Sequence, residues 1–346
     1  MKPLIELTRK NIWLLDSYSS QRNQDNDMGK AVWLDANENP YNHPFNRYPD
    51  PCQTLLKQSI AHAKGLDSRQ IFVGNGTDEA IDVLYRCFAE PGTDNVVSIS
   101  PTCGRYKVYA DINNIEYRTV SLHDGFRFSP QEMLGRCDRH TKMIWFCSPN
   151  NPTGNNLDRD DIIHVIEHFD GLVVVDETYA DFSNERQFAN DLNRWPNLVV
   201  LHSLNAAYGC AALSVGMAYA SADIIAIMDK VKYPYNVNTP SQKQATEAIK
   251  AFPDMNKWVK ILLLERGRMI EAFSLLPICE AVYPTNANFF LAKMTDATAI
   301  HDYLKRQGIM VRNCTDMPLC HNCLRITVGT PEQMDRLFAG LDEILG

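Results

Sequence analysis

Residues 141–182 read "TKMIWFCSPNNPTGNNLDRDDIIHVIEHFDGLVVVDETYADF" and hold the pattern that best indicates the fold. Two short apolar runs, at 143–147 and 172–175, enclose a segment in which apolar residues from Ile162 to Ile166 recur at helical spacing. Near-continuous runs of valine, isoleucine and leucine that alternate with helices are typical of a parallel sheet covered on both faces. The stretch therefore predicts a strand–helix–strand unit.

The same alternation extends to both sides of this unit. The segment at 74–90, "GNGTDEAIDVLYRCFAE", predicts a turn that leads into a helix. The runs "NVVSIS" (95–100) and "NLVVLHS" (197–203) predict further buried strands. We therefore expect an α/β fold with a large domain at residues 46–245, built on a mostly parallel sheet flanked by helices.

The pattern changes after residue 245. A long amphipathic helix is predicted at 255–276, followed by strand-like "ANFFLAKM" (287–294), a second helix at 297–308 and strand-like "CLRITVG" (323–329). These elements predict a smaller α+β domain at residues 246–346, closed by a terminal helix. We expect residues 1–45 to form an N-terminal arm or to join the small domain.

Composition narrows the functional class. The 346 residues are 45% hydrophobic and 22% charged, with a formal net charge of −8. Nucleic acids and anionic membranes require a basic face, so we expect neither as a partner, whereas a few arginines in one pocket still permit a small anionic ligand. The start of the chain lacks the apolar core of an export signal, and no apolar run approaches the roughly 20 residues that span a bilayer. A cytoplasmic protein is expected.

Ten cysteines are scattered along the chain, mostly in apolar runs. Cys314, Cys320 and Cys323 lie close together, but a structural zinc site needs four ligands, and this group has no second pair at a useful spacing. We therefore expect a loop that enters a strand, and no metal.

Polar residues follow the predicted strands and the predicted turn. The backbone amides of Thr77 and Asp78, at the start of a helix, could meet a phosphate, although an ordinary helix start has the same pattern. Asn150 and Asn151 lie in a proline-rich turn, where asparagine is common for conformational reasons alone. Asp176 ends a strand too apolar to hold a carboxylate without a partner, and Tyr179 follows three residues later. In an open parallel sheet, such strand ends are where ligands bind.

Taken together, these pieces resemble a known family across essentially the whole chain. The order and spacing are those of the class I/II, fold-type I aminotransferases that use pyridoxal phosphate. Within that family the chain is most similar to the branch that transfers an amino group between L-histidinol phosphate and 2-oxoglutarate in histidine biosynthesis. The resemblance rests on "LDANENPYN", "RYPDP", "GNGTDEAID", "SPNNPTGN", "VVVDETYADFS", "YPYNVN" and "CLRITVGT".

The resemblance implies a role for each residue of the cofactor site. Asp176 would pair with the protonated pyridine nitrogen and keep the ring an effective electron sink. Asn151 and Tyr179 would hydrogen-bond the phenolic oxygen of the ring. The cofactor phosphate would be held by the amides of Thr77 and Asp78 and by the hydroxyl of Ser203.

The resemblance also implies a substrate site and a homodimer. Arg325 would bind the carboxylate of an amino-acid substrate, and Arg312 would meet a second anion, because a guanidinium matches oxyanions with two parallel hydrogen bonds. For either arginine alone, a surface ion pair would be the ordinary interpretation. Tyr48 would reach into the site of the neighbouring subunit.

Four positions depart from the family pattern. The anchoring loop of the family runs Thr/Ser-x-Ser-Lys-Ala-aromatic-Gly and then Leu/Ile-Arg-x-Gly, whereas this chain has "SLNAAYGCAALSVG" from Ser203 to 216. The second serine is thus Asn205, the Schiff-base lysine is Ala206, and the phosphate-binding arginine is Ser214. Upstream, the family's ring-stacking tyrosine is Cys103.

Each loss has a predictable cost. A positioned acid–base group contributes roughly 10²–10⁴-fold to a rate, and alanine can supply neither that nor a covalent link. A charge-assisted hydrogen bond contributes roughly 1.5–3 kcal/mol, so Ser214 should weaken the hold on phosphate by about 10–100-fold. The nearest lysines in sequence, Lys230 and Lys232, lie at the end of a predicted helix. His202 lies at a strand end, where its direction cannot be predicted.

Three explanations follow from these departures. A laboratory Lys→Ala variant would account for Ala206 but not for Asn205, Ser214 and Cys103. A natural divergent member could have lost the chemistry and kept a binding role through its substrate arginines. The chain could also bind pyridoxal phosphate non-covalently and weakly, and catalyse slowly. We expect impaired or absent aminotransferase activity, with a non-catalytic sensor of a phosphorylated or dicarboxylic amine as the alternative.

Overall fold

Seven strands form the central sheet of the computed structural model, which describes residues 1–16 and 32–345. The strands lie in the order β1-β7-β6-β5-β4-β2-β3. All neighbours from β6 to β3 are parallel, and β7 runs antiparallel to both β1 and β6. Their bounds are Ile71–Asn75 (β1), Asn95–Ser100 (β2), Glu116–Ser121 (β3), Thr141–Cys147 (β4), Leu172–Asp176 (β5), Leu198–Ser203 (β6) and Val215–Tyr219 (β7).

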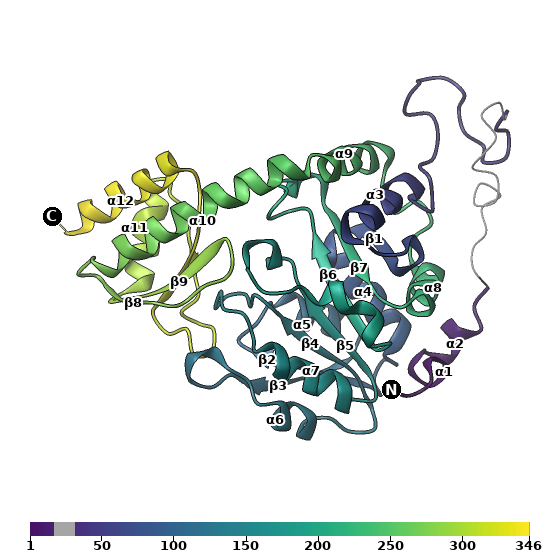
Figure 1. Cartoon of the computed structure of the whole chain (residues 1–346), viewed down its shortest axis with the longest axis horizontal. Coiled ribbons are helices and arrows are strands. Elements are labelled where there is room, and N and C mark those ends of the chain that lie inside the picture. The colour runs from purple at the N-terminus through teal and green to yellow at the C-terminus, as the bar shows by residue number, and fades with distance from the viewer. Residues whose placement is uncertain (17–31, 346) are drawn as a thin grey trace.

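Helices cover both faces of this sheet, as the apolar strands require (Figure 1). One face packs against α3 and α7 through residues such as Ile60 and Ile162, and the other packs against α4 and α8 through Leu84 and Ile225. The helices of this layer are α3 (Thr54–Lys64), α4 (Gly76–Phe88), α5 (Arg105–Ile112), α6 (Pro130–Gly135), α7 (Arg159–His168), α8 (Ala222–Val231) and α9 (Thr239–Lys250). Short 3₁₀ turns occur at Ser68–Gln70, Asp124–Phe126, Ala180–Phe182, Phe188–Arg194 and Ala211–Leu213.

The start of the chain lies against the large domain. Helices α1 (Leu4–Leu7) and α2 (Lys10–Trp13) bury Leu7 and Ile12 in the apolar cluster shared with α4 and α8. Much of the expected N-terminal arm, residues 17–31, falls outside the described residues.

A second, four-stranded antiparallel sheet forms the small domain, in the order β10-β11-β9-β8. Its strands are Cys279–Val282 (β8), Phe289–Met294 (β9), Arg312–Asn313 (β10) and Cys323–Thr327 (β11). It packs against α10 (Phe252–Ser274), α11 (Ala297–Arg306) and α12 (Pro331–Leu345). Figure 1 shows α10 running from the large domain to the small one.

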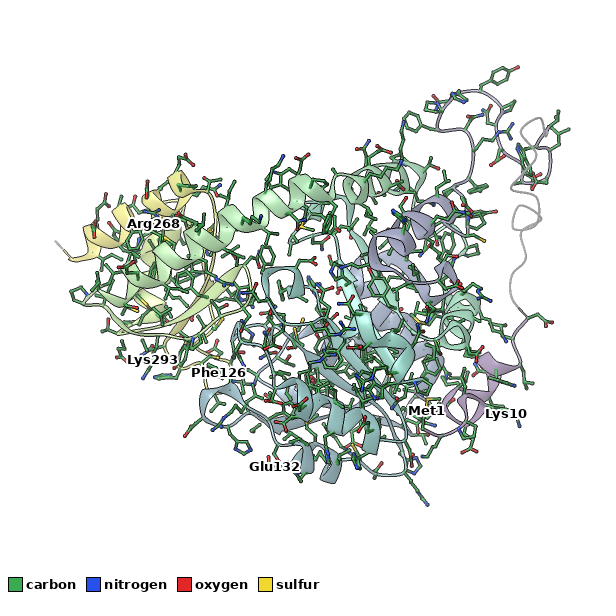
Figure 2. All side chains as sticks on the ribbon, in the orientation of Figure 1. Met1, Lys10, Phe126, Glu132, Arg268 and Lys293 are labelled. Atoms are coloured by element: carbon green, nitrogen blue, oxygen red, sulfur yellow. The ribbon has the colours of Figure 1, made fainter. Side chains whose placement is uncertain are left out.

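Side-chain contacts hold these parts together. Arg268 of α10 donates to Glu265 at 2.5 Å and to Asp335 of α12 at 2.8 Å, within the small domain (Figure 2). Phe126 of the large domain contacts Tyr283 edge-on, with ring centroids 5.0 Å apart. Among the described residues, no helix has the length and apolar character needed to cross a membrane.

The predicted fold class is confirmed: a mostly parallel sheet with helices, and a smaller α+β part. The strands predicted at 95–100 and 197–203 are β2 and β6, and the strand–helix–strand unit is β4-α7-β5. The predicted helix at 255–276 begins three residues earlier, at Phe252.

Candidate functional site

The carboxyl ends of β4, β5 and β6 lie side by side and bring the predicted polar residues to one edge of the sheet. Residue 147 pairs with Asp176, and Asp176 pairs in turn with Leu201 of β6. The segments that follow these strands therefore begin beside one another, where ligands bind in open parallel sheets.

Asp176 is held in this edge by two neighbours. Its carboxylate is 5% exposed, and a buried carboxylate needs hydrogen-bond donors. The hydroxyl of Tyr106 donates to Oδ2 at 2.7 Å, and Thr178 donates to Oδ1 from its amide at 3.0 Å and its hydroxyl at 2.5 Å. Tyr106 is itself fixed by stacking on Trp145, with ring centroids 5.0 Å apart. The carboxylate therefore has a fixed position.

Asn151, Tyr179 and Arg325, three of the predicted site residues, form one contact group. The Asn151 amide donates to the Tyr179 hydroxyl at 3.3 Å, and the guanidinium of Arg325 donates to the Asn151 side-chain oxygen. The ring of Phe289 contacts Tyr179 and Arg325. Its centroid lies 5.0 Å from that of the Tyr179 ring and 5.3 Å from the guanidinium carbon of Arg325. Burial raises the pKa of Tyr179, and Cys147 and Asp176 act in the same direction, so the phenol stays protonated. The group joins the two domains.

The first turn of α4 forms a close backbone cradle. Gly76 has a φ of +72°, which favours glycine, and its amide donates to the carbonyl of Ser214. A Cβ added to Gly216 of β7 would collide with the backbone amide of Thr77. The amides of a first helical turn have no partner within the helix, so the cradle offers donors to an anion. The group that the family carries at this position, a phosphate, fits these residues.

Ser203 and Asn205 lie at the start of the loop after β6. The Ser203 side chain is 1% exposed and its hydroxyl accepts the amide of Asn205 at 3.0 Å. The side-chain oxygen of Asn205 is buried and has no hydrogen-bond partner among the described residues. The loop therefore carries polar atoms that the protein itself does not satisfy.

Ala206 follows in this loop, partly buried against the core on the α3 face of the sheet. The two lysines nearest in sequence are used elsewhere. The ammonium of Lys230 donates to the carbonyl of Trp13 at 2.9 Å, and that of Lys232 donates to the carbonyl of Pro51 at 2.8 Å. Neither contact lies at the anchoring loop.

His202 belongs to a buried ion cluster. It is fully buried, with Nε2 3.0 Å from Asp181 Oδ2, and Lys64 Nζ lies 3.6 Å from the other oxygen of Asp181. Burial alone would raise the pKa of Asp181, but His202 and Lys64 hold it well below its usual value. The histidine is thus engaged with a structural carboxylate.

Cys103 and Arg105 also lie at this edge of the sheet. Burial raises the pKa of Cys103 to about 11, so the thiol is neutral at ordinary pH. Arg105 begins α5, and its Nε lies 3.3 Å from Asp78 Oδ1 in the first turn of α4. Sequence reasoning missed Arg105 and also the donors Tyr106 and Thr178.

Other predicted residues lie further away. Arg312 of β10 is exposed and is paired in register with Arg325 of β11, so both side chains share one face of the small sheet. Asn150 is fully buried and donates to Pro101 at 3.0 Å, a structural contact. Tyr48 is 48% exposed and stacks on Tyr235, with centroids 4.5 Å apart.

The three neighbouring cysteines are buried and free. The amide of Cys323 donates to the carbonyl of Cys320 at 3.0 Å, which makes a turn directly before β11. Within the part of the chain that the structure describes, no group of three metal-binding side chains is arranged to hold an ion.

Comparison with known proteins places this geometry in context. Residues 14–341 match the model of the family described as aminotransferase class I and II. The chain is 53% identical over 341 residues to a histidinol-phosphate aminotransferase of Bacteroides fragilis strain YCH46, covering 99% of each chain. It is 49% identical over 346 residues to that of Bacteroides thetaiotaomicron, covering 100% of both.

Solved structures share the fold at lower identity. The histidinol-phosphate aminotransferase from Clostridium acetobutylicum superimposes with a TM-score of 0.80 at 19% identity, covering 87% of this chain and 91% of that one. The one from Sinorhizobium meliloti, solved in complex with pyridoxal-5'-phosphate, gives 0.77 at 21% identity, covering 86% and 83%.

Proposed function

Because the chain belongs to the class I and II aminotransferase family, we propose that it binds pyridoxal phosphate non-covalently and a small anionic amine at the edge described above. The inherited reaction is amino transfer between L-histidinol phosphate and 2-oxoglutarate, and in this chain it is impaired or absent. The observation that carries this proposal is the alanine at position 206, together with the engagement of Lys230 and Lys232 elsewhere.

The cofactor, when bound, supplies an electron-accepting ring and a reactive carbonyl carbon. Asp176, fixed by Tyr106 and Thr178, accepts from the protonated ring nitrogen and keeps the ring cationic. Asn151 and Tyr179 would donate to its phenolic oxygen. The amides of the first turn of α4 and the hydroxyl of Ser203 hold the phosphate.

Two arginines from the small domain select the substrate. Arg325 donates to the side-chain oxygen of Asn151, so its guanidinium would lie close to a bound cofactor and could orient a carboxylate there. Arg312, on the same face of the small sheet, meets a second anion, such as the phosphate of histidinol phosphate. The division into domains at 46–245 and 246–346 is part of this proposal.

The missing step is proton transfer. The methyl group of Ala206 can neither attach the cofactor nor move a proton at the substrate carbon. Loss of a positioned acid–base group costs roughly 10²–10⁴-fold in rate, and loss of covalent activation adds to this. Because His202 is paired with Asp181, it does not replace the missing lysine in proton transfer.

A borohydride-trapping experiment tests this proposal. The purified protein is saturated with pyridoxal phosphate, treated with borohydride, dialysed and analysed by peptide mass spectrometry, with Ala206→Lys in parallel. We expect the cofactor to leave the unchanged protein and to remain attached to the variant at residue 206. A cofactor fixed to some other lysine of the unchanged protein, or brisk turnover of L-histidinol phosphate, would contradict the proposal.

A non-catalytic sensor is the second candidate, supported by Arg325 beside Asn151 and by Arg312 on the same face of the small sheet. It predicts that L-histidinol phosphate binds equally well with and without pyridoxal phosphate. Calorimetric titration of the protein freed of cofactor separates the two functions, because cofactor-dependent binding favours the aminotransferase-like one.

We propose that the protein acts as a cytoplasmic homodimer. Large apolar side chains are exposed along residues 32–48, where the chain projects from the large domain (Figure 1). Tyr41 is 79% exposed and Phe45 71% exposed, and Tyr48 lies beside them, which supports contact with a second subunit's site. Sedimentation velocity tests the assembly, and a monomer at micromolar concentration would contradict it.

A further inference from the structure

Arg105 is a cation at the mouth of the α4 cradle that has no fixed hydrogen bond. Its Nε lies 3.3 Å from Asp78 Oδ1, and its side chain is 55% exposed. In contrast to Arg325, its guanidinium donates no hydrogen bond to any of the described residues. A guanidinium has five N–H donors, so nearly all of the binding capacity of Arg105 is free.

The surroundings of Arg105 direct this free capacity toward the candidate site. Burial lowers the pKa of Arg105, but Asp78, Cys103, Tyr179 and Asp176 together outweigh it and raise the pKa. Three of these four residues line the proposed cofactor site, and the fourth contributes an amide to the phosphate cradle. Cys103 is a small side chain, so it leaves the guanidinium access to the site.

The opposite wall of the cradle lacks a cation. Ser214, where the family pattern has arginine, places its hydroxyl 3.4 Å from the point where a Cβ on Gly76 would lie. A hydroxyl there can donate one neutral hydrogen bond. A phosphate carries about two negative charges, and the Asp78 carboxylate in the same turn repels it. Without a counter-charge the cradle would hold a phosphate poorly.

We propose that Arg105 supplies the cationic contact to the cofactor phosphate that the family pattern assigns to the position of Ser214. This inference rests on the proposed function. The guanidinium bridges Asp78 and the phosphate, so that it binds the ligand and neutralises the repelling carboxylate at once. The charge thus enters the cradle from α5 instead of from the β6–β7 loop.

The test compares pyridoxamine 5'-phosphate with pyridoxamine, which lacks only the phosphate. Neither can attach to a lysine, so calorimetric titration measures the non-covalent hold alone. Arg105→Met should weaken binding of pyridoxamine 5'-phosphate by about 10–100-fold and leave pyridoxamine unchanged. Arg105→Lys should lose less, because it keeps the charge. Lys107→Met is the matched control, since Lys107 lies on the same helix and pairs with Asp111 at 2.7 Å, and it should bind both ligands normally.

Each result has a distinct meaning. If the unchanged protein shows no preference for the phosphorylated ligand, the proposed function fails and this inference with it. If it shows that preference and Arg105→Met retains it, the inference alone is wrong. The double variant Arg105→Met/Ser214→Arg should restore the preference for the phosphorylated ligand. The same double variant tests the inference if Arg105→Met alone folds poorly. Failure of this rescue in a folded double variant would count against a shared phosphate contact.

Discussion

Glu177 offers the sharpest test of the electrostatics at this edge of the sheet. It follows Asp176 directly and is 3% exposed. Its carboxylate accepts the amide of Phe188 at 2.5 Å and that of Ala189 at 3.4 Å. Burial raises the pKa of Glu177 to about 7, and these amides, with Lys64 and Arg159, oppose the rise only in part.

The magnitude follows from proton linkage. A carboxyl with a pKa of 4.5 in the unfolded chain and about 7 in the folded one binds its proton more tightly when folded. Between these values the folded state holds more protons, so the free energy of unfolding falls as pH rises. The total loss is roughly 3 kcal/mol, at about 1.4 kcal/mol for each pH unit. Asp181, whose pKa is lowered, titrates below this window and does not mask the effect.

Glu177→Gln removes the charge but keeps an oxygen for the Phe188 amide. We expect its free energy of unfolding, relative to that of the unchanged protein, to rise by roughly 3 kcal/mol between pH 4.5 and pH 8. Urea unfolding followed by tryptophan fluorescence at several pH values measures this difference. Glu185→Gln is the control, because Glu185 is exposed in the same segment and should give no such change. A Glu177→Gln difference that stays constant with pH would refute the reasoning.

Further predictions concern the walls of the site. Tyr106→Phe removes the hydrogen bond to buried Asp176 and should lower the free energy of unfolding by about 1.5–3 kcal/mol in urea titrations. An unchanged free energy of unfolding would show that water replaces the tyrosine as the donor. Gly216→Ala drives a methyl group into the first turn of α4, so it should cost about 1–3 kcal/mol in the same assay and abolish binding of pyridoxamine 5'-phosphate. Ala206→Lys should gain slow turnover in a coupled glutamate assay, and full activity from this single change would show that the other departures matter little.

Local sequence was sufficient to predict four strands of the large sheet, β2, β4, β5 and β6, whereas β1 and β7, which are also buried, were not predicted. β4, β5 and β6 are continuous apolar runs because helices cover them on both sides. The edge strand β3, Glu116–Ser121, was missed because only one of its six residues is buried and its polar residues hide the pattern. Strand β7 was not predicted either, and its antiparallel direction depends on its neighbours β1 and β6 and not on its own residues.

The candidate site, like the fold, could be predicted only in part. The positions of Asp176, at the end of β5, and of Asn151 and Tyr179, after β4 and β5, could be predicted from the strand pattern, and their roles stay predictions. Their partners could not, because Tyr106 lies 70 residues from Asp176 in the sequence and Arg325 lies 174 residues from Asn151. A buried carboxylate predicts that a hydrogen-bond donor lies nearby, but the sequence does not identify which of the 14 tyrosines is that donor.

The contacts of the site show that its polar side chains hold one another without help from residue 206. Asp176 is stabilised by Tyr106 and Thr178, and Asn151 by Arg325, so these two polar side chains have partners within the protein. Ala206 takes part in none of these side-chain bonds. We therefore expect Ala206→Lys to leave this arrangement intact, so that any change of activity in that variant reports on the chemistry at residue 206 and not on the fold.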